Sequence, residues 1–149
     1  MPRPMPRFLL LAPVAFLTAG CVMDGDPVVA PSACPVSDSR DWTAFVNAMP
    51  GPDARPELIV SGTVVLPTAG YTVGLRPGPA DLSAQPVQTV QLVAIPPDGP
   101  AATVLSEVDV RLSMPSLAVQ PGEGAPYRGV QIFCEGAELA FITPVETAW

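Results

Sequence analysis

The stretch ELIVSGTVVLPTAGYTVGL, residues 57–75, carries the pattern that determines the fold class. In its first ten residues apolar side chains alternate with polar or small ones, which is the period of a strand with one buried face. The PTAG segment that follows has the composition of a turn, and the last five residues place Tyr71, Val73 and Leu75 on one face. Together they predict a β-hairpin. The side chains expected to face the core from its first strand are Leu58, Val60, Val64 and Leu66.

Further segments show the same period of two residues and predict additional strands. They are residues 85–95, 102–113, 127–135 and 138–143. The alternation is clearest in the second of these, where the residues predicted to point inward are Val104, Val108, Val110 and Leu112. The third places Ile132 and Cys134 on one face, so we expect Cys134 to face the core.

Proline and glycine are concentrated between these strands. The chain has 21 prolines, and connectors rich in Pro and Gly occupy residues 76–84, 96–100 and 120–126. Proline fixes φ and removes a backbone donor, so short elements joined by stiff turns are expected. Six or seven short strands at such spacing predict a mostly β fold, namely an Ig-like antiparallel β-sandwich with polar outer faces.

Residues 37–49 show a different spacing. Ser37 or Asp38 can cap a helix, and Pro50 can end it. Apolar residues fall at i, i+3, i+4 and i+7, which predicts one short N-terminal helix that packs on the sheet through this stripe. The alternative is that the stripe docks on a membrane or a partner. The stripe consists of Trp42, Phe45, Val46 and Met49.

The charge balance and residue types argue against several functions. The chain has seven arginines, no lysine and no histidine, against 14 acidic residues, for a net charge of −7. Such a surface disfavours nucleic acid, and without histidine no Ser-His-Asp triad can form. Neither a Gly-rich phosphate loop nor a metal-ligand cluster is evident, so we predict no enzyme, no cofactor and no metal. A hydrolase using a carboxylate pair is the alternative, with Asp38 and Asp41 or Glu107 and Asp109 as candidates.

The N-terminus has the three parts of a secretion signal. Residues 1–7 are basic, residues 8–17 are apolar, and LTAGC at residues 17–21 places small residues before a cysteine. An apolar run of ten residues is too short to span a bilayer, which needs about 20. The segment resembles the type II signal peptide of bacterial lipoproteins. The resemblance implies that residues 1–20 are removed, that Cys21 receives fatty acid such as palmitate, and that the protein is attached to the membrane of the cell envelope.

This resemblance sets the expected organisation of the rest. In Gram-negative bacteria, Val22 after the cysteine would imply the outer membrane, facing the periplasm. Residues 21–33 would form the lipidated N-terminus and a flexible tether, and residues 34–149 a single β-rich domain. With Cys21 acylated in an oxidising compartment, Cys34 and Cys134 remain as an even pair and are predicted to form a disulfide.

The turn at residues 66–71 has a second resemblance. Leu66-Pro67-Thr68-Ala69-Gly70-Tyr71 is similar to the N-P-T-T-G-Y/F loop of chagasin-like inhibitors of papain-type cysteine proteases, which are Ig-like β-sandwiches. Leu66 and Ala69 depart from that motif. The resemblance implies a candidate binding loop comprising Pro67, Thr68, Gly70 and Tyr71.

These patterns combine into one expectation. We expect a small, disulfide-stapled envelope lipoprotein with a binding or structural role, whose contacts are the membrane, through its lipid, and an envelope protein partner. A protease-inhibitor-like sandwich and an envelope hydrolase are the alternatives.

Overall fold

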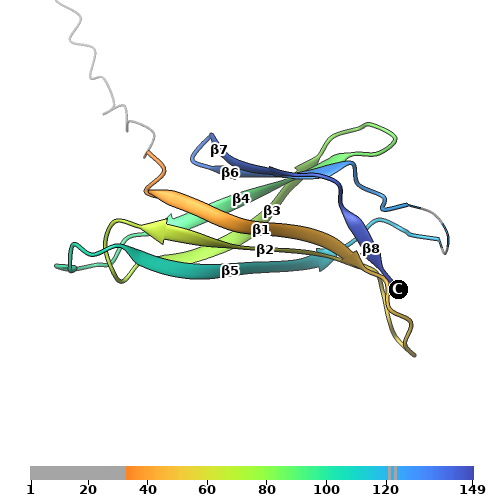
Figure 1. Cartoon of the computed structure of the whole chain (residues 1–149), viewed down its shortest axis with the longest axis horizontal. Coiled ribbons are helices and arrows are strands. Elements are labelled where there is room, and N and C mark those ends of the chain that lie inside the picture. Colours follow the sequence, from red (N-terminus) through yellow and green to blue (C-terminus); the bar gives the residue numbers. More distant parts are fainter. Residues whose placement is uncertain (1–32, 121, 123) are drawn as a thin grey trace, which may run out of the picture. The chain divides into compact units, whose positions relative to one another are not determined.

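Eight strands form the regular structure of the part of the chain that the computed structural model describes, residues 33–149 apart from 121 and 123. The predicted signal, Cys21 and the tether therefore lie outside the described residues. The strands are β1 (Asp38–Asn47), β2 (Glu57–Leu66), β3 (Thr72–Ala80), β4 (Val87–Ile95), β5 (Ser106–Pro115), β6 (Gly129–Cys134), β7 (Ala137–Ile142) and β8 (Glu146–Ala148). They form two four-stranded sheets, ordered β5-β2-β1-β8 and β3-β4-β6-β7 (Figure 1).

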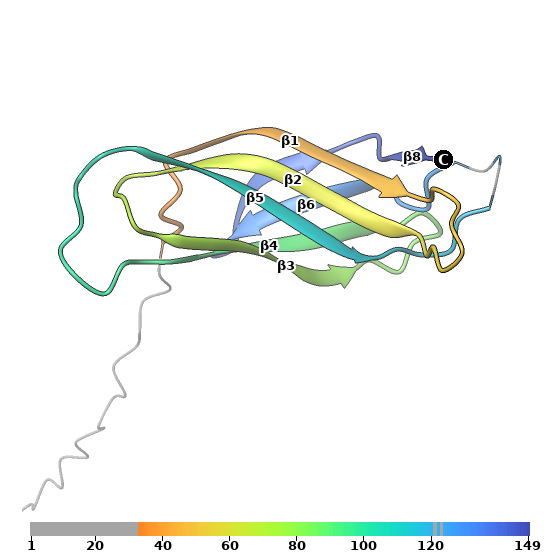
Figure 2. The ribbon, with the colours of Figure 1, turned by 90° about the horizontal axis from the view of Figure 1, so that it is seen from below.

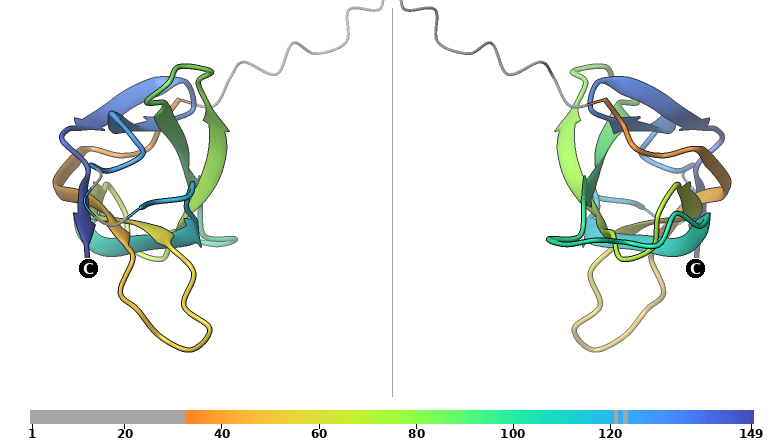
Figure 3. Two further views of the ribbon diagram at one scale, coloured as in Figure 1. Left: turned by 90° about the vertical axis from the view of Figure 1, so that its right-hand side faces the viewer. Right: turned by 90° about the vertical axis from the view of Figure 1, so that its left-hand side faces the viewer.

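One hydrophobic core lies between the two sheets. Side chains from both sheets fill this core, because every second side chain of a strand points to the same face of its sheet. The first sheet contributes Leu58, Val60, Val64 and Leu66, which are fully buried, as the sequence pattern predicts. The opposite sheet contributes Val90, Leu92, Val130 and Ile132. Viewed along the strands, the two layers face each other around this core (Figure 3).

The predicted hairpin at residues 57–75 is wrong in its pairing. β2 pairs with β1 and β5, whereas β3 pairs with β4 in the other sheet. Both edges of β2 are thus occupied, so the turn after Leu66 carries the chain from one sheet to the other. The strands at both ends of that turn are as expected, but they do not bond to each other.

Two pairings are parallel, so the prediction of an antiparallel sandwich is also only partly correct. β1 pairs with β8 and β4 pairs with β6 in parallel. The chain leaves β4, runs back through β5 in the opposite sheet, and then enters β6 from the same end as β4. Because β5 reverses the chain direction in the other sheet, β6 runs in the same direction as β4.

The predicted helix at residues 37–49 is wrong: these residues form β1. The pairing with β2 shifts between Arg40 and Thr43, and Asp41 has a φ of 57°. This β-bulge places two residues of β1 opposite one of β2 and reverses which alternate residues face inward. The apolar positions imitate a helical stripe because Phe45, on the outward side of the strand, and Met49, beyond its end, are apolar as well as the inward-facing Trp42 and Val46. In the strand, Ala44 and Val46 are buried, whereas Met49 lies beyond it and is exposed.

Prolines lie on the edge strands of the two sheets. Pro77 and Pro79 are in β3, and Pro115 ends β5. These two strands are each at the edge of their own sheet and lie next to each other across the layers. Proline cannot donate to a ladder, so it is tolerated at such edges and discourages pairing with other chains.

The predicted disulfide is confirmed. Cys34 is bonded to Cys134, with their Cα atoms 5.4 Å apart, and it joins the segment before β1 to the end of β6. Cys134 faces the core, as its place in the alternating pattern predicts. The other predicted strands are present, with three corrections. Residues 76–80, predicted as part of a connector, continue β3; Val104 lies before β5 and is exposed; and the three-residue strand β8 was not predicted.

Candidate functional site

The loops of the sandwich gather at two opposite ends. At the first, the Cys34–Cys134 disulfide lies beside the β2–β3 turn (residues 67–71) and the β4–β5 loop (residues 96–105), which meet where Ala69 N donates to Ala102 O at 3.2 Å. We call this the Cys34 end. It lies opposite the C-terminus in Figure 1. The described chain therefore begins at the same end as these two loops.

The other end is defined by the C-terminus, and we call it the Trp149 end. It contains the β1–β2 loop (residues 48–56) and the start of the β5–β6 connection. Ala48 N donates to Ala148 O at 2.8 Å, and Ser116 N donates to Pro56 O at 2.9 Å. Ten-residue strands such as β2 separate the two ends by about 33 Å at 3.3 Å per residue.

The candidate binding loop lies at the Cys34 end. Pro67, Thr68 and Tyr71 are half-buried, and Gly70 is exposed with a φ of 89°, a left-handed conformation that favours glycine. Tyr71 lines a small pocket together with Pro35 of the N-terminal segment. The four predicted residues are thus brought together in one turn, but this turn packs against neighbouring segments rather than projecting from them.

Exposed apolar side chains accompany this turn. Ile95 is 53% exposed, Val104 54% and Leu105 69%. They flank the β4–β5 loop, which has three prolines and a single charged residue, Asp98. Sequence reasoning missed this feature, because Val104 extends the alternating pattern of β5 although the strand starts at Ser106.

The Trp149 end has a separate apolar group. Met49 is 58% exposed and Trp149 49%. Both line a hollow of about 260 Å³ that also includes Val119 and Arg55. Leu82 in the β3–β4 loop and Leu117 in the β5–β6 connection are also exposed. The sequence analysis placed Met49 in a helical stripe, with docking on a membrane or a partner as the alternative, but it did not predict that Met49 and Trp149 line one hollow.

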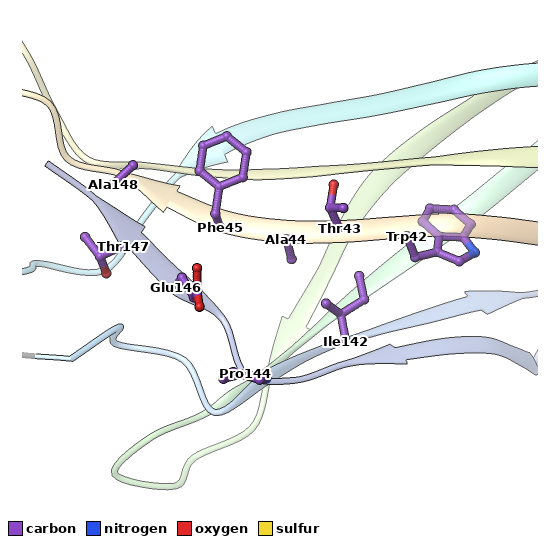
Figure 4. A pocket seen from close by; sticks show the side chains of 9 residues that line it. All are labelled: Trp42, Thr43, Ala44, Phe45, Ile142, Pro144, Glu146, Thr147 and Ala148. Carbon is purple, nitrogen blue, oxygen red and sulfur yellow. The ribbon is translucent and has the colours of Figure 1, made fainter.

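A hollow of about 540 Å³ lies beside β1 where the C-terminal segment leaves β7 and joins the first sheet (Figure 4). Trp42, Ile142 and Pro144 give it apolar walls, and Glu146 is its one ionisable residue. The buried atoms Trp42 Nε1 and Thr147 Oγ1 have no hydrogen-bond partner among the described residues. Both atoms are buried, so neither is offered to a molecule in the hollow, and the hollow does not bring two carboxylates together.

The carboxylate pairs considered for hydrolysis lie on β1 and on the exposed side of β5. Arg40 Nη2 is 2.6 Å from Glu107 Oε1, and its Nε is 3.7 Å from Asp41 Oδ2. The hydrogen bond and the charge of Glu107 raise the pKa of the Arg40 guanidinium. Asp109 Oδ1 accepts from Thr63 Oγ1 at 2.8 Å. The carboxylates of Glu107 and Asp109 are thus bound to neighbouring strands on an open sheet face.

Within residues 33–149, less 121 and 123, no group of three or more potential metal ligands comes together. The same residues contain no helix with the length and apolar character needed to cross a membrane.

Comparison with protein families, curated proteins and solved structures found no match to this chain.

Proposed function

We propose that this protein is a lipid-anchored protein of the bacterial cell envelope with a binding or structural role and no catalytic activity of its own. In this proposal Cys21 carries the lipid, residues 22–33 form the tether, and the sandwich is the functional unit. The signal-like sequence of residues 1–21 supports the anchor, and the disulfide at Cys34 supports an oxidising compartment.

One observation of the structure carries the proposal. The described chain enters the sandwich at the Cys34 end, so in this proposal the tether is attached at the end opposite Trp149. Twelve tether residues span at most about 40 Å, and the strands add about 33 Å. The Trp149 end can therefore extend well beyond the lipid headgroups.

This orientation makes the Trp149 end the proposed partner-binding surface. Met49 and Trp149 are the large apolar side chains there, and Trp and Met are both enriched in protein interfaces. We also propose that the domain is Ig-like in the broad sense of two facing sheets whose end loops make the contacts. The envelope partner is then recognised by loops, while the polar sheet faces remain in water.

Substitution of Cys21 tests the anchor. In a bacterial host, the unchanged protein should be processed to the length of residues 21–149 and should be released from membranes only by detergent. Cys21→Ser should stay at precursor length, because the lipoprotein peptidase requires the modified cysteine. Substitution of both Cys34 and Cys134 by Ala is the matched control and should leave processing unchanged. Processing of Cys21→Ser at the same site would contradict the proposal.

A photo-crosslinking residue tests the binding surface. At Met49 it should form a crosslink to the same envelope protein in repeated experiments, whereas at Arg111, on the exposed side of β5, it should not. Equal crosslinking at both positions would show that the Trp149 end has no special role.

A further inference from the structure

The β4–β5 loop at the Cys34 end combines features of a membrane-contacting loop. Ile95, Val104 and Leu105 expose more than half of their side-chain surface. Their neighbours in residues 96–103 are mainly proline, alanine and glycine. Single exposed apolar residues need no explanation. Here Ile95 ends β4 and Val104 and Leu105 close the loop, so three exposed apolar side chains are found at the two ends of one connection.

The loop is held in place by its neighbours. Gly70 lies so close to Pro97 that an added Cβ would be 3.3 Å from the Pro97 Cβ, and Ala69 N donates to Ala102 O. Val104 N donates back to Ala102 O at 2.9 Å. Prolines at 96, 97 and 100 restrict φ further, so little conformational freedom remains to be lost when the apolar residues are buried.

The position of the loop indicates what covers it. The described chain starts at the Cys34 end, where Ala33 and Pro35 line one small pocket together with Pro96 of this loop. If Cys21 is lipidated, as the proposed function requires, the twelve residues between the lipid and Cys34 keep this end within about 40 Å of the bilayer. The apolar loop is then held at high local concentration next to a lipid surface.

The charges of this end favour an uncharged lipid surface. Asp98 and the exposed Glu135 are the ionised groups that the loops and the β6–β7 turn contribute, and the whole chain has a net charge of −7. Anionic headgroups would repel these carboxylates, whereas zwitterionic headgroups would not. The chemistry thus differs from that of polybasic membrane-binding segments.

We propose that the β4–β5 loop inserts Ile95, Val104 and Leu105 into the headgroup–acyl boundary of the bilayer that anchors the protein. This inference rests on the proposed function. The loop holds the sandwich upright on the membrane, with the Trp149 end outward. A short apolar loop binds lipid weakly by itself, and the tether makes the contact persistent.

Depth measurements on the lipidated full-length protein test this contact. Leu105→Cys and Met49→Cys, each carrying an environment-sensitive dye, are compared in phosphatidylcholine vesicles that contain spin-labelled lipid. Insertion by about 5–10 Å should make quenching at position 105 about twofold or more that at position 49, with a blue-shifted emission. Equal quenching at both positions would overturn the insertion.

A second pair of variants tests whether the Leu105 side chain itself contacts the lipid. With the dye at Ala102→Cys, the additional substitution Leu105→Glu should reduce quenching to the level of position 49. The matched control is Leu82→Glu, which adds the same charge at a fully exposed leucine in the β3–β4 loop and should leave quenching unchanged. No effect of Leu105→Glu would contradict the proposal.

Flotation separates this inference from the proposed function. Protein that floats with vesicles but shows no quenching at position 105 is anchored without loop contact, which overturns the inference alone. Protein that does not float lacks the anchor, which overturns both.

Discussion

At the scale of single residues, the most constrained contact is that of Trp42 with Gly62. The indole lies over the glycine, and an added Cβ would be 2.3 Å from Trp42 Cε3. The β-bulge at Asp41 directs Trp42 inward, and the missing side chain at position 62 makes room for the ring. Gly62 is thus required by packing rather than by its backbone conformation.

We expect Gly62→Ala to lower the free energy of unfolding by about 1–3 kcal/mol, as overpacked cores do. Gly74→Ala is the control, because no atom lies within 4 Å of its added Cβ, and it should be neutral or stabilise by up to about 1 kcal/mol. Urea unfolding of both variants measures the difference. Equal stabilities would show that the indole does not occupy this space.

Truncation of the ring supplies a coupled prediction. Trp42→Ala should cost about 3 kcal/mol, the low end for a large aromatic residue, since the side chain is only partly buried. In that background Gly62→Ala should cost much less than alone, with a coupling energy of about 1 kcal/mol or more. Strict additivity of the two substitutions, measured by urea unfolding, would contradict the packing described.

Asp81 shows a local electrostatic effect in the β3–β4 loop. Hydrogen bonds from the Ser83 hydroxyl and amide lower the pKa of this carboxyl. Because its pKa is lower in the folded protein, the Asp81 carboxylate stabilises the folded loop at pH values above its unfolded pKa of about 3.9. This stabilisation is lost as the pH falls through the pKa of the folded state. By NMR titration, Ser83→Ala should raise the pKa of Asp81, while the remote Thr68→Ala should not. An unchanged value in Ser83→Ala would refute the assignment.

At the scale of elements, β1 shows how a strand can be hidden in a sequence. After the bulge, even-numbered residues face the core, so Val46 is fully buried and Thr43 points to solvent. Val46→Ala should therefore cost about 2 kcal/mol for the two buried carbons lost, whereas Thr43→Ala should change stability little. Thermal unfolding measures both. Similar costs for the two substitutions would argue against the strand register.

Strands with an uninterrupted period of two could be predicted from the sequence. β2, β4 and β6 are such cases, because alternation within one strand is a local property. Their partners could not be predicted, because the β2–β3 turn has the composition of a hairpin turn although it crosses between sheets. β8 has three residues, too few for a period to show.

The candidate site was predictable only in part. The Cys34–Cys134 pair followed from cysteine number and compartment, and the β2–β3 turn from its Pro and Gly. The exposed apolar residues of the two ends were not predictable, because exposure of Val104 or Met49 depends on where a strand ends in space. From the sequence alone, an apolar residue in an alternating pattern is predicted to be buried in the core.

At the scale of the whole molecule, the disulfide closes almost the entire domain. It joins residues 100 positions apart, and removal of a native disulfide from a small secreted domain typically costs about 2–5 kcal/mol. We expect the double substitution of Cys34 and Cys134 by Ala to lower the melting temperature. Reductant should lower that of the unchanged protein similarly and leave the double variant unaffected. Insensitivity of the unchanged protein to reductant would contradict this role.

In the proposed function, the two ends of the sandwich have different roles. The Cys34 end receives the chain from the proposed anchor and carries Ile95, Val104 and Leu105, while the Trp149 end carries Met49 and Trp149. In Figure 2 these ends lie at opposite extremes of the long axis. All of these assignments to membrane and partner depend on attachment at Cys21.

The most direct test of that attachment is the mass of the N-terminal peptide of the protein purified from the membranes of its host. We predict that the peptide begins at Cys21, carries the added mass of fatty acyl chains, and loses that mass on chemical deacylation. A peptide that begins at Met1, or one that contains Cys21 without acyl chains, would contradict the anchor and with it the proposed orientation.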